Sequence, residues 1–301
     1  MESRIFKCIA SKIAFRLFCG CDNDFENFLA GLTKKENWKL HMLSRGVNRR
    51  FTALFAAGPG AHVRAGRRGI SYIEKVPFSQ SCSAEDLGFI CRWSGLSYPR
   101  LAGISLKAYR RLLVVAAQRR PTNHYHHAGH FAHVVIASGL LAYAAGLTAR
   151  ERALLVLAAL VHDLDHSGRY TPSKLFAQET ASARRAMRIV LGSGGDARLS
   201  FRLLWLLKAT ALTFHDDRKA ILTGDRLARL LADADLFSSL FFSRQKAIQL
   251  TRRLNLEMLK TGDPVAQYDA FIDSMLRAGA HSAAGRSLLV QKFVGGQSRG
   301  Q

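Results

Sequence analysis

Five of the eleven histidines lie within ten residues of the sequence, in a segment that begins at His124. On an α-helix, His126, His130 and His133 would share one face, because they are separated by four and three residues. The segment is otherwise mostly apolar, so these imidazoles would be buried, and a buried imidazole needs a metal ion or a hydrogen-bond partner. The pattern predicts a metal site or a buried polar network, and the spacing leaves both open.

A second group of titratable residues follows an apolar run. The segment 162–166, His-Asp-Leu-Asp-His, places four titratable side chains in five residues, directly after the apolar run 153–161. An imidazole nitrogen and an adjacent carboxylate are typical ligands of divalent cations, and one carboxylate can bridge two ions through its two oxygens. Burial of these groups without a cation would be costly. The segment therefore favours a metal site over a solvated loop.

Two further carboxylates lie far along the chain, at Asp233 and Asp235. Asp235 follows Leu231 by four residues and so leans toward the apolar stripe of its predicted helix, which makes it the expected metal ligand. Asp233 follows Arg229 by four residues, and we expect it to be a structural group or a surface group paired with that arginine.

The elements that must position these residues are helices, because apolar residues recur every three or four positions from residue 101 onward. The predicted fold class is all-α. Capping residues and glycine or proline stops predict helices over 106–117, from 122 or 123 to about 145, over 153–161 after a capping box at 148–151, over 173–191, over 199–214, and around a stripe of Leu227, Leu231 and Ala234.

Composition limits the partners. The 44 Lys and Arg residues exceed the 22 Asp and Glu residues, giving a net charge of +22, which attracts anionic ligands. The basic residues are scattered and no base-reading motif accompanies them, so we expect no specific nucleic-acid partner. The segment 131–149 lacks charged residues but is only weakly apolar, and we expect no membrane span.

The cysteines indicate a reducing compartment, and we expect a cytoplasmic protein. Their odd number and irregular spacing fit neither a disulfide framework nor a CxxC zinc site. No uninterrupted apolar run typical of a secretory signal occurs in the first 21 residues. The cysteines all lie in the first third of the chain, at Cys8, Cys19, Cys21, Cys82 and Cys91.

In order and type, these motifs resemble those of the class I 3′,5′-cyclic-nucleotide phosphodiesterases, within the HD-domain metal-dependent phosphohydrolases. The segment 125–134 matches the family's YHxxxHxxxV, and HDLDHSG at 162–168 matches HDxDHxG with serine in place of the usual proline. Similar elements are AT at 209–210, although Ala211 replaces an aspartate, ADL at 234–236, GD at 262–263 and FID at 271–273. The resemblance covers roughly 105–280, with a shorter interval between Asp163 and Asp235 than the family usually has.

The resemblance implies a site with two metal ions. A zinc-like ion would be held by His130, His162, Asp163 and Asp235, and Asp163 would bridge to a second ion, magnesium or manganese, that keeps most of its water. The residues that would hydrogen-bond the surrounding waters are His166, Glu179, Thr210 and Asp165. A metal-bridged hydroxide would attack phosphorus, and His126 would be the general acid that protonates the leaving 3′-oxygen.

Recognition of the base is where the sequence departs from the family. The resemblance places Tyr125, Gln267, Tyr268 and Phe271 at the substrate, with the ring of Phe271 stacked on the base. Tyr268 stands where the family carries the glutamine that reads the purine edge, and Gln267 lies one residue away. Either the register shifts by one residue or purine recognition is altered.

The resemblance also implies a domain division and a function. We expect an unassigned basic extension over 1–95, a catalytic domain over 96–295 and a flexible tail over 296–301. The expected reaction is hydrolysis of cyclic AMP or cyclic GMP to the 5′-monophosphate in signal transduction, since a histidine one turn before a metal ligand suits an alkoxide leaving group. The alternatives are a phosphohydrolase for another nucleotide or phosphate ester, and a non-catalytic sensor that binds metal or nucleotide.

Overall fold

The structure is a computed structural model that describes residues 55–297 apart from 77–81, 119–122, 168–175 and 212–215. The chain falls into two compact units, Met1–Gly58 and Pro59–Gln301, and the fold described below is that of the second unit. The sequence boundary predicted near residue 95 stays a prediction, and the second unit includes helices on both sides of it.

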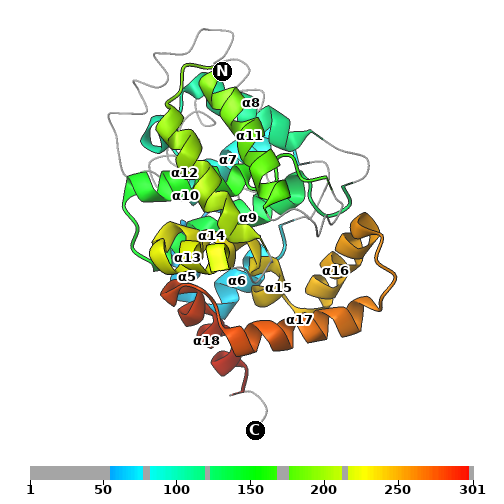
Figure 1. Cartoon of the computed structure of the whole chain (residues 1–301). Coiled ribbons are helices and arrows are strands. Elements are labelled where there is room, and N and C mark those ends of the chain that lie inside the picture. The colour runs from blue at the N-terminus through cyan, green and yellow to red at the C-terminus, as the bar shows by residue number, and fades with distance from the viewer. Residues whose placement is uncertain (1–54, 77–81, 119–122, 168–175, 212–215, 298–301) are drawn as a thin grey trace, which may run out of the picture. The chain divides into compact units, whose positions relative to one another are not determined.

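All elements in the described part of this unit are helices, which confirms the all-α prediction (Figure 1). In chain order they are α5 Pro59–Ala65, α6 Arg67–Ile73, α7 Ala84–Ser94, η1 Pro99–Ala102, α8 Leu106–Ala117, α9 Ala128–Ala144, α10 Ala149–Val161, α11 Ala177–Leu191, α12 Ala197–Leu207, η2 Lys208–Thr210, α13 Asp216–Gly224, α14 Arg226–Asp235, α15 Phe237–Phe241, α16 Arg244–Met258, α17 Pro264–Ala278 and α18 Ala283–Gln297.

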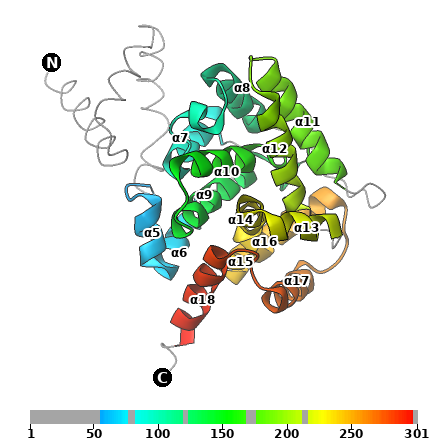
Figure 2. The ribbon, with the colours of Figure 1, turned by 60° about the vertical axis from the view of Figure 1, so that its left-hand side comes forward.

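Helices α9 and α10 form the centre of the unit. Figure 2 shows them side by side, with α5 and α14 on either side of α9. The sequence of α9 has apolar residues around its whole circumference, so it must be covered on all sides, and every residue from Ala128 to Ala142 is buried. None of the helices in the described ranges has the length and apolarity that a membrane crossing requires.

Close approach of α7 to α9 depends on Gly139. A Cβ atom added at this position would lie 2.7 Å from the Cα atom of Ser94, so the two backbones meet where a side chain has no room. We expect Gly139→Ala to lower the free energy of unfolding by about 1–3 kcal/mol, because overpacking outweighs the better helix propensity of alanine. Gly224→Ala is the control, since no atom lies within 4 Å of its added Cβ. Equal denaturant midpoints for the two variants would contradict the prediction.

The local helix signals are largely confirmed. The hydroxyl of Ser105 accepts a hydrogen bond from the backbone N–H of Ala108 at the start of α8, and Thr148 and Glu151 form a reciprocal capping box at the start of α10. The start predicted for α9, at residue 122 or 123, is wrong. The helix begins at Ala128, and the imidazole of His127 is its N-cap, accepting from the backbone N–H of Gly129.

Two other predicted helix boundaries lie at residues outside the described part of the chain. The predicted start at Ser173 lies outside the described residues, where α11 is described from Ala177. The predicted helix over 199–214 is α12 followed by the short η2, and residues 212–215 lie outside the described part.

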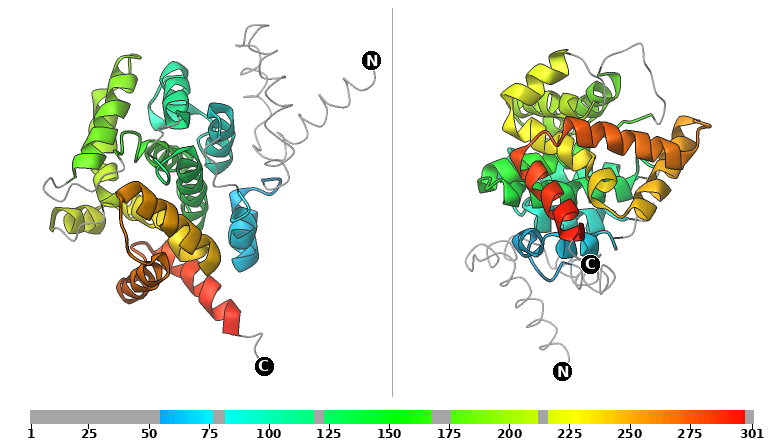
Figure 3. Two further views of the ribbon diagram at one scale, coloured as in Figure 1. Left: turned by 90° about the vertical axis from the view of Figure 1, so that its right-hand side faces the viewer. Right: turned by 90° about the horizontal axis from the view of Figure 1, so that it is seen from below.

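The last helices carry residues that the family resemblance assigns to the substrate. In Figure 1 and in the right-hand view of Figure 3, α17 runs from the end of α16 to α18. The ring of Tyr268 on α17 is buried against Ala247 and Ile248 of α16, and this contact joins the two helices.

Candidate metal and catalytic site

The ends of three packed helices bring four predicted metal ligands together. His130 lies in the first turn of α9, His162 is the C-cap of α10 with Asp163 directly after it, and Asp235 is the last residue of α14. Since α9, α10 and α14 all contact one another, these positions converge. We call these four residues the tetrad.

The ligand atoms of the tetrad are closely spaced. The Nε2 atoms of His130 and His162 are 3.1 Å apart. The Oδ2 atom of Asp163 lies 3.3 Å from the Nε2 of His130 and 3.0 Å from that of His162. The Oδ1 atom of Asp235 lies 3.4 Å from both nitrogens. All four atoms therefore face a common point.

This arrangement fits a zinc-type ion. Tetrahedral ligands at about 2.0–2.2 Å from a zinc ion are separated from one another by roughly 3.3–3.6 Å, which is close to the spacing of the tetrad. The Nδ1 atom of His162 lies 2.8 Å from the carbonyl oxygen of Ala159 and so donates its proton there. Its Nε2 atom then presents a lone pair to the tetrad, the usual orientation of a metal-binding histidine.

The charges of the tetrad residues shift the pKa values of one another. Burial alone would lower the pKa of His130 and His162, but their hydrogen bonds and attraction to Asp163 and Asp235 outweigh it and raise both pKa values. Burial would likewise raise the pKa of Asp163, yet the charge of His162 holds it well below its usual range. The carboxylates of the tetrad thus favour the protonated form of its imidazoles.

Zinc binding should therefore release protons and weaken as pH falls. Because the pKa values of His130 and His162 are raised, a cation must compete with protons for their nitrogens more strongly than at an ordinary imidazole. We expect calorimetric titration of metal-free protein to show lower zinc affinity at about pH 6 than at about pH 8, on either side of the ordinary imidazole value. Buffers of different ionisation enthalpy would count the protons released. An affinity independent of pH would contradict the prediction.

Beside the tetrad lies a second cluster, formed by His126, His166 and Glu257. The Nδ1 atom of His126 lies 2.5 Å from Oε1 of Glu257, and the imidazoles of His126 and His166 stack with ring centres 3.7 Å apart. The Nε2 atom of His126 lies 3.6 Å from Oδ2 of Asp163. His126 is thus held on one side by Glu257 and faces the tetrad on the other.

Glu257 belongs to the candidate site, and the sequence analysis missed it. Its Oε2 atom also accepts the backbone N–H groups of Tyr125 and His126, at 2.7 and 2.9 Å. Burial alone would raise the pKa of Glu257, but these hydrogen bonds and the charge of His126 lower it to about 2. The chain separates Glu257 from His126 by 131 residues, so no local pattern linked them. The only sequence signal is an acid between Leu256 and Met258, shortly before the GD element.

The predicted helical face of three histidines is wrong. His126 lies in the bend before α9, two residues ahead of the helix, and its position is set by Glu257. His133 does lie on α9, but its Nε2 contacts the carbonyl oxygen of Val76 at 3.3 Å and its ring meets Phe242 edge-on. The side chain of Asn123 joins the bend to the 162–166 turn by donating to the carbonyl oxygens of His126 and His166.

Two of the residues expected to hydrogen-bond metal-bound waters, Glu179 and His166, have shifted pKa values. Glu179 is half-buried, and burial together with the charges of Asp163 and Asp235 raises its pKa to about 7. Burial and the charge of His126 lower the pKa of His166 to about 4. Their predicted roles stay predictions.

Thr210 and Asp165 have other partners in the structure. The hydroxyl of buried Thr210 donates to the carbonyl oxygen of Leu207 at 2.8 Å. The carboxylate of Asp165 accepts from Arg185 at 2.8 Å, with both side chains about one-third exposed. Their roles also stay predictions.

Asp233 does not form the surface pair predicted with Arg229. It is buried, and its carboxylate accepts the backbone N–H groups of His281 and Ser282 at 2.7 and 2.8 Å, just before α18. Arg229 instead donates to the carbonyl oxygens of Leu222 and Thr223. The sequence allowed a structural role for Asp233, and that part is confirmed.

The residues expected to contact the substrate lie on two segments, the bend before α9 and helix α17. Tyr125 is buried with its ring 4.7 Å from that of His130, behind the tetrad. Tyr268 is buried and its hydroxyl donates to the carbonyl oxygen of Ser239 at 3.4 Å. The amide of Gln267 lies against Gly262, and Phe271 is half-buried one turn further along α17. Their contact with a base stays a prediction.

Comparison with protein-family models and with curated protein sequences gave no match. Among the solved structures that resemble the chain are two phosphodiesterase domains. One is the phosphodiesterase domain of a rhodopsin phosphodiesterase from Salpingoeca rosetta, 20% identical with a TM-score of 0.52, covering 72% of this chain and 85% of that chain. The other, from the RhoPDE fusion protein of the same choanoflagellate, is 20% identical with a TM-score of 0.50, covering 72% and 89%. The chain thus has the fold of these domains, as the sequence resemblance predicted.

Proposed function

We propose that this chain, which folds like a phosphodiesterase domain, is a metal-dependent hydrolase that converts a 3′,5′-cyclic nucleotide to its 5′-monophosphate. One observation carries the proposal. A tetrad with the spacing of cation ligands lies next to a histidine whose Nε2 is 3.6 Å from Asp163 and whose Nδ1 is held by Glu257. Hydrolysis of a phosphoester with a strongly basic leaving oxygen is accelerated by both features, positive charge at the phosphate and an acid for the leaving oxygen.

The tetrad is the proposed site of a zinc-type ion, and Asp163 is the proposed link to a second ion, magnesium or manganese. When bound, these ions would neutralise the charge of the phosphate group and lower the pKa of water so that it can attack phosphorus. A bridging role suits Asp163 because its carboxylate already faces both clusters.

His126 is the proposed general acid, and its neighbours determine which nitrogen acts. Because Nδ1 donates its proton to Glu257, the ring presents Nε2 toward the tetrad. When Nε2 is protonated, it can give that proton to the 3′-oxygen as the phosphorus–oxygen bond breaks. The two backbone N–H bonds to Glu257 hold the bend at 125–126 against α16, which limits rotation of the ring.

A second candidate is hydrolysis of another nucleotide or phosphate ester. It is favoured by the burial of Tyr268, at the position where the resembling family carries a purine-reading glutamine, and by the turn of Gln267 toward Gly262. This candidate uses the same two clusters and differs only in what the walls of the site recognise.

The deciding experiment is chromatographic detection of 5′-AMP and 5′-GMP after incubation of the purified chain with cyclic AMP or cyclic GMP, with magnesium and manganese added. Product that disappears after chelation of the metals would support the proposal, and the ratio of the two products would give the base preference. Inert cyclic nucleotides together with cleavage of monoesters or nucleoside triphosphates would favour the second candidate. Metal-loaded, folded protein without activity on any phosphoester would overturn both.

A further inference from the structure

Exposed apolar side chains gather on one part of the molecule. Twelve large apolar side chains are exposed in the described part of the chain, and seven of them belong to residues 98–114 or to the helices α11 and α12. Single exposed apolar residues are ordinary on a protein surface, whereas a group of them marks an interaction site. The seven are Tyr98, Leu101, Leu106, Val114, Leu191, Phe201 and Trp205.

The helices α8, α11 and α12 form one layer over α10. Helix α11 contacts both of the others, and all three contact α10 (Figure 2). The hydroxyl of Ser105, the N-cap of α8, donates to the carbonyl oxygen of Ser193 at 3.5 Å, so the start of α8 lies beside the turn that joins α11 to α12. Since each of the three helices turns one side toward α10, the exposed sides face outward together.

The outer side of α12 carries two aromatic rings. Arg198, Phe201 and Trp205 are separated by three and four residues, so they form one row along the helix. Phe201 is 68% exposed and Trp205 is 42% exposed. The indole N–H of Trp205 donates to Oδ2 of Asp225 at 3.1 Å, which fixes the ring while much of it stays at the surface.

Basic side chains lie around these rings. On α11, Arg184, Arg188 and Leu191 form an exposed row with the same spacing as the row on α12. In the described part of the chain, no acidic side chain forms an ion pair with Arg184, Arg188 or Arg198. The neighbouring acid, Asp196, caps α12 by accepting the backbone N–H of Arg198. We define the α12 face as the two rows together, Arg184, Arg188, Leu191, Arg198, Phe201 and Trp205.

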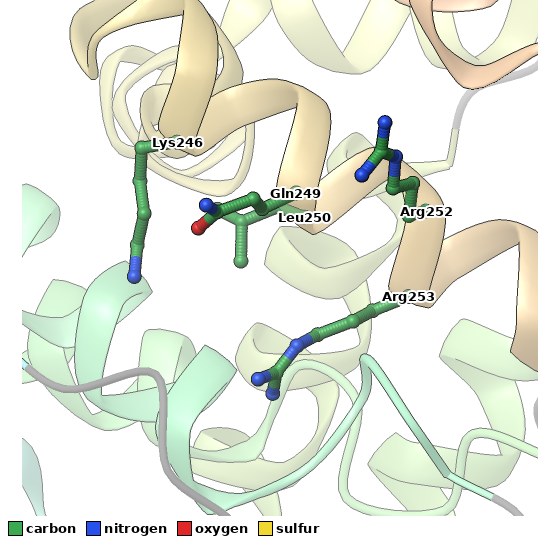
Figure 4. Close-up of a pocket in the computed structure, with 5 residues that line it drawn as sticks. All are labelled: Lys246, Gln249, Leu250, Arg252 and Arg253. Atoms are coloured by element: carbon green, nitrogen blue, oxygen red, sulfur yellow. The ribbon is translucent and has the colours of Figure 1, made fainter.

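A basic row on α16 shows what distinguishes the α12 face. Figure 4 shows Lys246, Leu250 and Arg253 pointing to the same side of that helix. Leu250 is buried, and the two basic side chains are half-buried. That row therefore offers charge without an exposed apolar side chain, whereas the α12 face offers both.

We propose that the α12 face binds to the surface of a membrane that contains anionic lipids. Aromatic side chains enter the boundary between headgroups and acyl chains, and neighbouring basic side chains bind the lipid phosphates, as in peripheral membrane proteins. Arginine suits this place because its apolar stem lies along the boundary while its charge stays in water. The net charge of +22 adds attraction at longer range.

The proposal does not depend on the proposed hydrolysis. The residues of the α12 face belong neither to the tetrad nor to the cluster of His126, His166 and Glu257. Binding to lipid can therefore be measured with protein that has no metal and no substrate.

The test is sedimentation of the full chain with vesicles of phosphatidylcholine and phosphatidylserine in equal parts. We expect binding that falls as salt is added and that is much weaker with phosphatidylcholine alone. Phe201→Ser should weaken binding about tenfold, because an inserted ring is lost, and Phe201→Trp should keep it. Arg188→Gln and Arg198→Gln should each weaken it about fivefold.

The matched controls lie elsewhere on the molecule. Arg68→Gln removes the same charge from an exposed position on α6, and Val290→Ser removes an apolar side chain that is 58% exposed on α18. Both should bind like the unmodified chain, and thermal unfolding checks that every variant is folded.

Three results would overturn the proposal. One is the absence of binding to the anionic vesicles, and another is equal weakening by the controls and by the variants of the α12 face. The third is self-association of the chain, measured by analytical ultracentrifugation, that Phe201→Ser abolishes while vesicle binding stays unchanged, since this would assign the face to a second copy of the chain.

Discussion

Asp163→Asn should abolish hydrolysis of cyclic nucleotides, with a loss of at least about a thousandfold in kcat/KM, since metal ions supply several kcal/mol of transition-state stabilisation. The carboxylate of Asp163 also faces His126, and its Oδ2 atom lies within 3.3 Å of both tetrad nitrogens. Asparagine is similar in size but lacks the charge that the proposed link between two cations requires. We therefore expect metal content, measured by elemental analysis, to fall together with activity.

The matched control for this variant is Asp196→Asn. Asp196 is exposed and caps α12, a role that asparagine fills equally well. Its activity and metal content should match those of the unmodified chain. If Asp163→Asn retained both the metal and the turnover, the assignment of the tetrad would be wrong.

His126→Ala should lower kcat with cyclic nucleotides by about a hundredfold or more while the metal content stays nearly intact. The reason is that the imidazole faces the tetrad at 3.6 Å from Asp163 but lies outside the set of four converging ligand atoms. The variant loses the proton donor for a strongly basic leaving oxygen and keeps the groups that bind the phosphate.

A change of substrate separates this role from a merely structural one. Bis(p-nitrophenyl) phosphate has a weakly basic leaving group that needs little protonation, so its hydrolysis should fall by less than about tenfold in the same variant. Equal losses with both substrates would show that His126 does not act as the acid. Loss of metal in parallel with turnover would show that it belongs to the metal site.

The helices that were predicted well are those with complete local signals. The predicted bounds 106–117 agree with α8, because Ser105 provides the cap at one end and the Arg-Arg-Pro segment ends the apolar period at the other. The stripe around Leu231 lies in α14, and the carboxylate of Asp235 at the end of that helix faces His130 and His162. Capping and periodicity involve residues within one or two turns, so they can be seen in a single sequence.

The candidate site was only partly predictable for the opposite reason. The four tetrad residues were found because each stands in a short motif. The start of α9 was misplaced because Thr122 and Asn123 are better N-cap types than His127, which is the N-cap in the structure. Glu257 carries no motif at all, and its importance comes only from the contact of α16 with the 125–126 bend. Tertiary contacts over such distances leave no periodic signal.

The distance along the chain between the two clusters has a consequence for biosynthesis. The tetrad is complete once the ribosome has released α14, whereas Glu257 emerges 22 residues after Asp235. Since folding during synthesis proceeds from the N-terminal side, a nascent chain can assemble the tetrad before it can orient His126. A translation product or proteolytic fragment that stops within α16 should therefore sequester metal without turnover.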